Sequence, residues 1–111
     1  YQNAHPEFVR LVMNENILNG AYVARSKTIQ RLNIAVIEAL RNLLGRGQKA
    51  GAFRPDIDPI DLHMSISALC FFNVANRATF STIFKRDMAS SKALSARRTQ
   101  VVDAIMRYVK P

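Results

Sequence analysis

Residues 55–61 of the chain are Pro-Asp-Ile-Asp-Pro-Ile-Asp, and this stretch determines where the helix that decides the fold begins. Asp58 is a preferred residue for capping a helix, and Pro59 suits the first helical position because an N–H is not needed there. Asp61 follows three residues after the cap, where a carboxylate reaches back to free backbone amides. The stretch therefore predicts a helix from Pro59 to about Asn76.

Apolar side chains cover nearly the whole circumference of this predicted helix. They are Leu62, Met64, Ile66, Leu69, Cys70, Phe71, Phe72 and Val74. A helix that is apolar on all sides is buried on all sides. A domain of this size covers only one side of it, so we expect a second chain to cover the other. Phe80 and Phe84 leave open an extension of the helix through residue 84.

Upstream of residue 55, glycine and proline are few and mark the boundaries of segments with helical periodicity. A first helix is predicted from Pro6 to a stop at Asn19-Gly20, followed by a short helix over 21–25. A long amphipathic helix is predicted over 27–50, with Gly51 as its C-cap. Its buried face is predicted to contain Ile29, Leu32, Val36, Leu40, Leu43 and Leu44.

Downstream, residues 85–91 are polar and predict a loop, and a last helix is predicted over 92–109. Its broad apolar face comprises Val101, Val102, Ile105, Met106, Tyr108 and Val109. A terminal helix frays unless it docks, and an apolar patch this wide is typical of an interface. The expected fold class is all-α, an antiparallel helical bundle of about five helices.

Length and composition indicate one globular domain over residues 1–111. With 49% hydrophobic residues the chain has material for a core and requires no disulfide or metal ion. Its one cysteine, Cys70, fits a reducing compartment, and no apolar run reaches the roughly 18 to 20 residues that a membrane span requires. We therefore expect a cytoplasmic protein with no membrane partner.

The formal net charge is +8, and a charge this positive is typical of proteins that bind phosphate groups. The basic residues are spread from Arg10 to Lys110, however, and do not form one arm. This distribution favours solvated helix faces over a dedicated nucleic-acid patch.

The sequence carries no pattern of catalytic or metal-binding residues. The two histidines, His5 and His63, lie far apart, and no CxxC, HxxxH or HExxH spacing occurs. There is no glycine-rich phosphate loop after a strand and no GxSxG elbow. We therefore expect no enzymatic activity, no metal ion and no cofactor.

Three motifs, taken in order, resemble the C-terminal domain of the TetR (tetracycline-repressor) family. They are His-Pro-Glu-Phe at 5–8, Arg-Gly-Gln-x-x-Gly-x-x-Arg-Pro-Asp-x-Asp-Pro at 46–59, and Ala-Arg-Arg-x-x-Val-Val-Asp at 96–103. The connector at 46–59 is the most distinctive, and the resemblance covers nearly the whole chain. The family also has an N-terminal helix-turn-helix domain, and no such pattern lies within residues 1–111, so that domain is expected to be absent from this chain.

The resemblance implies a homodimer in which the helices over 59–76 and 92–109 pair with their symmetry mates as a four-helix bundle. The expected interface residues are Leu62, Ile66, Leu69, Phe72, Val101, Val102, Ile105, Met106 and Val109. It also implies a small effector bound inside the domain, and operator DNA as a partner only through the N-terminal domain.

A ligand pocket is expected where aromatic and methionine side chains surround embedded polar groups, because a buried polar group requires a partner. The expected pocket residues are Phe8, Met13, Tyr22, His63, Met64, Ser67, Cys70, Phe71, Asn73 and Arg77. For each of them plain core packing is the alternative. These walls predict an apolar or amphipathic effector, with Arg77 or His63 facing its polar end.

Two other functions stay open from the residues alone. The chain is a basic helical module that binds nucleic acid directly, or it is a purely structural dimerisation domain with a solid core. Salt-dependent binding to duplex DNA distinguishes the first, and the absence of any ligand-sized cavity distinguishes the second.

Overall fold

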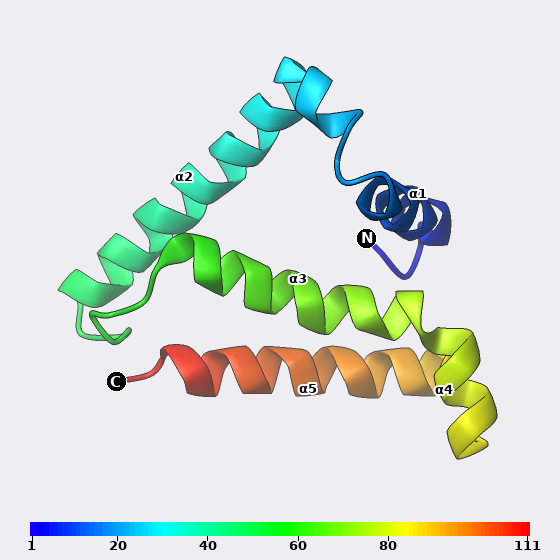
Figure 1. The fold of residues 1–111 in the computed structure, drawn as a ribbon. Helices are drawn as coiled ribbons and strands as arrows, with labels where there is room; N and C mark the ends of the chain where they lie inside the picture. The colour runs from blue at the N-terminus through cyan, green and yellow to red at the C-terminus, as the bar shows by residue number, and fades with distance from the viewer.

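The helix that begins at Pro59 lies at the centre of the molecule and contacts four others (Figure 1). The computed structural model describes residues 1–111, which form helices and contain no strand. The elements are α1 (Pro6–Ile17), the 3-10 turn η1 (Val23–Arg25), α2 (Lys27–Lys49), α3 (Pro59–Ala75), α4 (Arg77–Phe84) and α5 (Ser91–Val109). α5 runs antiparallel beside α3 (Figure 1). The predicted all-α class with about five helices is confirmed.

The cap of α3 is formed by one carboxylate. Asp58 Oδ1 accepts hydrogen bonds from the amides of Ile60, at 2.8 Å, and Asp61, at 3.0 Å. The prediction that the Asp61 carboxylate reaches back is wrong, because Asp61 contributes its amide as the capped donor. α3 ends at Ala75, where Asn76 leaves helical geometry, so residues 77–84 form the separate helix α4.

The other helix boundaries agree closely with the sequence. α1 begins at Pro6, and the chain turns through left-handed conformations at Asn19 and Gly20. The segment predicted as a short helix over 21–25 is a single 3-10 turn. α5 begins one residue earlier than predicted, because the Ser90 hydroxyl accepts the Ala93 amide at 3.1 Å and caps the helix.

The long helix α2 differs from the prediction of one continuous buried face. Leu44 is the only buried residue of α2, and Ile29, Leu32 and Val36 are exposed. Figure 1 shows the reason: α3 packs mainly against the C-terminal half of α2, and the first turns of α2 are contacted by the short η1 turn, which covers little of their apolar face. The amphipathic pattern is present, but the described residues cover only one end of it.

The connector between α2 and α3 is folded back on the last turn of α2. The carbonyl of Gly47 accepts the amides of Ala52, at 2.8 Å, and Phe53, at 3.1 Å. The side-chain amide of Gln48 donates to the carbonyls of residues 54–55 at 3.2 and 3.3 Å. The side-chain bonds explain the glutamine at position 48, and the ring of Phe53, which lies where a Cβ of residue 47 would be, explains the glycine.

The same connector is attached to the end of α5 through Arg54. Its amide donates to the carbonyl of Val109 at 2.9 Å, and its Nε donates to the carbonyl of Tyr108 at 2.8 Å. Its guanidinium lies 4.2 Å from the centre of the Tyr108 ring, within cation–π distance. Arg54 therefore satisfies carbonyls that the last turn of α5 leaves without helical donors.

The core is small and lies where α2, α3, α5 and the connector meet. Its buried members are Leu44, Ile57, Leu62 and Val109, with Leu40, Phe53, Ile66 and Ile105 packed against them. Seven of the 111 residues are buried, and the molecule is a thin slab of 45 × 37 × 19 Å. The apolar residues of the single chain therefore form only a small core, because a slab of this thickness leaves most of them at its surface.

Candidate ligand site and partner surface

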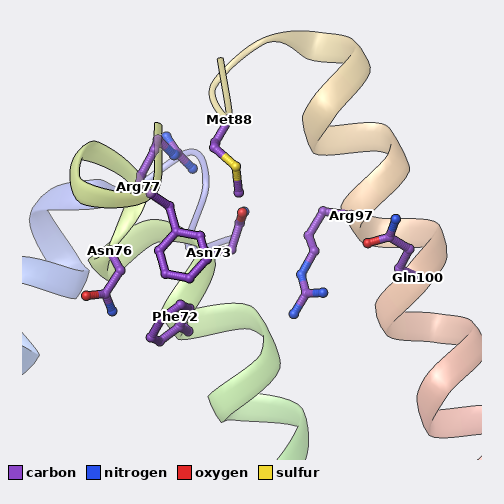
Figure 2. A pocket seen from close by; sticks show the side chains of 8 residues that line it. Phe72, Asn73, Asn76, Arg77, Met88, Arg97 and Gln100 are labelled. Atoms are coloured by element: carbon purple, nitrogen blue, oxygen red, sulfur yellow. The ribbon is translucent and has the colours of Figure 1, made fainter. Parts of the chain in front are cut away.

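Three neighbouring hollows surround the C-terminal half of α3. The first, between α3, α4 and α5, has a volume of about 270 Å³ and is called the α3–α5 hollow (Figure 2). Its lining residues are Phe72, Asn73, Asn76, Arg77, Phe80, Met88, Arg97 and Gln100. The aromatic rings of Phe72 and Phe80 meet edge to face at 5.1 Å and form its apolar wall.

The second hollow, about 430 Å³, lies under the N-terminal segment, and the third, about 470 Å³, lies between α1 and the junction of α3 with α4. The N-terminal hollow is lined by Tyr1, Gln2, Asn3, Ala4, Leu69, Cys70, Asn73, Arg97, Arg98 and Val101. The α1 hollow is lined by Pro6, Val9, Arg10, Met13, Val74, Ala75, Arg77 and Ala78. Asn73 and Arg97 line both of the first two hollows, and Arg77 lines the first and third.

A cluster of polar side chains connects these hollows. Asn3 Oδ1 accepts hydrogen bonds from Asn73 Nδ2, at 3.2 Å, and from Arg77 Nη2, at 2.6 Å. Asn73 is only 7% exposed, so its bond to Asn3 provides the partner that a buried amide requires. Two atoms in this region, Arg77 Nε and Gln2 Oε1, are buried without any hydrogen-bond partner.

The charge in this region is entirely positive. Arg97 Nη2 donates to the carbonyl of Leu69 at 3.2 Å, and Figure 2 shows its side chain reaching from α5 towards α3. No aspartate or glutamate lines any of the three hollows. The ion pairs of the molecule lie elsewhere and involve neither Arg77 nor Arg97.

The structure brings four of the ten predicted pocket residues to these hollows. Asn73 and Arg77 share the α3–α5 hollow, Cys70 lines the N-terminal hollow, and Met13 lines the α1 hollow. The other six, which line none of the three, are Phe8, Tyr22, His63, Met64, Ser67 and Phe71.

Sequence reasoning missed several residues that the fold brings to the hollows. Met88 lies in the loop between α4 and α5, and Asn3 lies 70 residues from its partner Asn73. Arg97 belongs to the Ala-Arg-Arg motif that carried the family resemblance. That motif was the available indication of a role for Arg97.

The predicted interface residues fall into three groups by burial. Leu62 and Val109 are buried in the core of the single chain, so they offer no surface to a second chain. Ile66, Leu69, Val101 and Ile105 are half-buried. Phe72, Val102 and Met106 are exposed by 48%, 56% and 43%, and Met64 on α3 is exposed by 61%.

The exposed apolar residues lie on two sides of the α3–α5 pair. Met64 and Phe72 are eight residues apart, so they lie on the same face of α3. Phe72 lines the α3–α5 hollow together with Gln100 of α5, so Gln100 lies on that side of the helix pair too. Helical spacing of four residues places Val102 on the face of α5 that carries Arg98, which lines the N-terminal hollow. The side with Met64 and Phe72 therefore faces away from the N-terminal segment, and we call it the α3 face.

No group of three or more His, Cys, Asp or Glu side chains is gathered where it would hold a metal ion. No helix is long and apolar enough to cross a membrane.

Comparison with known proteins identifies the family of this helical domain. The family model described as "Tetracyclin repressor-like, C-terminal domain" matches residues 1–105. The chain is also 32% identical over 110 residues to the HTH-type transcriptional repressor NicS of Pseudomonas putida. That alignment covers 99% of this chain and 52% of NicS, so the chain spans about half the length of this relative. The chain belongs to the tetracycline repressor-like family and corresponds to its C-terminal domain.

Proposed function

We propose that the chain is the effector-sensing and homodimerisation domain of a transcription regulator. Membership in the family supports a regulatory role for this domain. Operator DNA is the partner of the whole regulator and is contacted by a helix-turn-helix domain outside residues 1–111. The observation that carries the proposal is the exposed apolar surface of α3, the central helix of the molecule.

The proposed dimer forms through the α3 face. Met64 and Phe72 are large, apolar and exposed, and Ala68 between them is small and also exposed. On the same side of the slab, Gln100 and Ala104 of α5 are one helical turn apart and exposed. Large side chains beside small ones allow two copies of such a surface to interdigitate across a two-fold axis. A stable interface of this kind buries roughly 1,200–2,000 Å² in total.

The test is the molar mass of the purified protein in solution, measured by light scattering. The wild-type protein is expected to be a dimer, and Met64→Glu is expected to dissociate it. Burying the exposed part of Met64 contributes about 1–2 kcal/mol in each copy, so losing both copies raises the dissociation constant about 30- to 1,000-fold. Ile83→Glu on α4 is the matched control, because Ile83 is exposed to a similar extent, 63%, and lies outside the α3 face.

A second variant distinguishes the two sides of the slab. Val102→Glu places the same charge on the opposite side of the α3–α5 pair and is expected to leave the dimer intact. Dissociation by Val102→Glu and not by Met64→Glu would move the interface to that opposite side. A monomeric wild-type protein would contradict the proposed dimer.

The effector is proposed to bind in the hollows around the C-terminal half of α3. The α1 hollow is bordered by α1 and α4, and the α3–α5 hollow is bordered by α4 and α5. A ligand in these hollows therefore contacts helices from both the N-terminal and the C-terminal part of the chain. A ligand shifts a conformational equilibrium only by its differential affinity for the two states. The proposed dimer of α3 and α5 is the fixed frame, and α1 and α2 are the elements that move relative to it.

A further inference from the structure

Two arginines reach the α3–α5 hollow without a carboxylate partner. Arg77 comes from the first turn of α4 and Arg97 from α5, on opposite sides of the hollow (Figure 2). Both are partly buried, and each makes one hydrogen bond, to a neutral oxygen of Asn3 or of Leu69. Partly buried charges in proteins are ordinarily paired, so two unpaired guanidinium groups at one hollow require an explanation.

The hydrogen bonding of Arg77 points in the same direction. Its Nε is buried and has no acceptor, and a buried donor without an acceptor destabilises the structure. An anionic oxygen beside the guanidinium group of Arg77 would balance its positive charge, which the neutral Asn3 oxygen does not. Asn3 fixes Arg77 through the 2.6 Å bond, and the Leu69 carbonyl fixes Arg97, so both forks are held in position before any ligand arrives.

We propose that the α3–α5 hollow binds the carboxylate of a small amphipathic molecule through Arg77 and Arg97. This inference rests on the proposed effector-sensing function and names the chemical class of the effector. Guanidinium forks match the planar, two-oxygen geometry of a carboxylate. The apolar body of the ligand lies against Phe72, Phe80 and Met88. At about 270 Å³ the hollow is near the small end of ligand pockets, so it fits a molecule of one ring or a short chain.

The test compares carboxylates with uncharged molecules of the same shape on the full chain. The probes are benzoate and hexanoate, with benzyl alcohol and 1-hexanol as their uncharged counterparts and phenyl phosphate as the alternative anion. Binding is measured by calorimetry and by the rise in unfolding temperature. The two carboxylates are expected to bind and stabilise the wild-type protein, and the two alcohols are expected to bind at least about tenfold more weakly.

Three variants connect the binding to the two arginines. Arg77→Gln and Arg97→Gln are each expected to raise the dissociation constant for the carboxylates about tenfold or more. Arg31→Gln removes the same charge from an exposed site on α2 and is expected to leave binding unchanged. Arg97→Lys keeps the charge without the fork and is expected to bind more weakly than wild type. Circular dichroism checks that each variant is folded. If one of the two glutamine variants does not fold, the test rests on the variant of the other arginine.

The outcomes separate this inference from the proposed function. Equal binding of the alcohols and the carboxylates would overturn the anion site and leave effector sensing in place. If phenyl phosphate binds and neither carboxylate does, the assignment to carboxylates is overturned. If Arg31→Gln weakens binding as much as Arg77→Gln and Arg97→Gln do, the binding depends on general surface charge and the site is overturned. Failure of every probe to bind a protein that light scattering shows to be a dimer would overturn the inference alone.

Discussion

Two glycines near the end of α2 provide a sharp test of the packing described above. Gly45 and Gly47 lie two residues apart in the same helix. A Cβ added at Gly45 meets nothing within 4 Å, whereas a Cβ added at Gly47 overlaps the ring of Phe53. Phe53 packs against the core, so its ring has little room to move. Gly45→Ala and Gly47→Ala are therefore expected to change stability in opposite directions.

The magnitudes follow from two competing effects. Alanine in place of a helical glycine stabilises by about 0.5–1 kcal/mol, and this is the whole expected effect of Gly45→Ala. At Gly47 the same gain is opposed by overpacking, which costs about 1–3 kcal/mol. Gly47→Ala is thus expected to destabilise by about 1–2 kcal/mol. At about 4 °C per kcal/mol for a domain of this size, the unfolding temperatures of the two variants differ by about 6–12 °C.

The assay is urea and thermal unfolding followed by helical circular dichroism, at one protein concentration because a dimer couples stability to concentration. A double mutant isolates the contact between the added Cβ and the Phe53 ring. In a Phe53→Ala background, Gly47→Ala is expected to become neutral or stabilising. If Gly47→Ala stabilises the otherwise unchanged protein as much as Gly45→Ala does, the described packing of the connector on α2 is refuted.

Three smaller perturbations test other contacts. Asp58→Ala removes the cap of α3 and is expected to destabilise by about 1 kcal/mol, whereas Asp58→Asn keeps an oxygen acceptor and costs less; urea unfolding compares them, and equal losses would contradict the cap. Arg54→Ala removes the bond to the Tyr108 carbonyl and is expected to destabilise by about 1–3 kcal/mol, and unchanged stability would show that this link to α5 contributes nothing. The pKa of Glu7 lies below its ordinary value of 4.5 because a backbone hydrogen bond, and then His5, favour the carboxylate. Its stabilising contribution is therefore complete at neutral pH and is lost as the pH falls through the lowered pKa. An NMR titration that gives 4.5 or above would contradict this account of Glu7.

Local sequence features predicted the helix boundaries well because they act through near neighbours. Asp58 and Pro59 set the start of α3, and Pro6 and Gly20 delimit the region of α1. The sequence predicts the end of α3 at about Asn76 but leaves open an extension through residue 84, because the apolar pattern continues past Asn76 and the sequence there contains neither glycine nor proline. A helix that ends inside an apolar run is set by tertiary packing, which periodicity does not report.

The candidate site was harder to predict because its parts come from distant segments. The polar residues Asn73 and Arg77 were found because they interrupt an apolar helix. Their partner Asn3 lies 70 residues from Asn73 in the sequence, and the facing Arg97 lies on a different helix. Spacing within one helix therefore could not identify either residue. Burial on α2 was overestimated for a related reason: an amphipathic pattern predicts that a face is covered and does not say by which chain segment.

The central claim, dimerisation through the α3 face, is tested most directly by a distance measured across the dimer. In a Cys70→Ala background, a spin label at Ala68→Cys is expected to lie close to its counterpart, because paired helices stand about 8–10 Å apart axis to axis. A label at Thr79→Cys on α4, outside the α3 face, is expected to give a longer distance. A dipolar distance at 68 that is clearly shorter than at 79 is the result this structure predicts. A dimer in which position 68 shows no close counterpart, while position 102 does, would contradict the account.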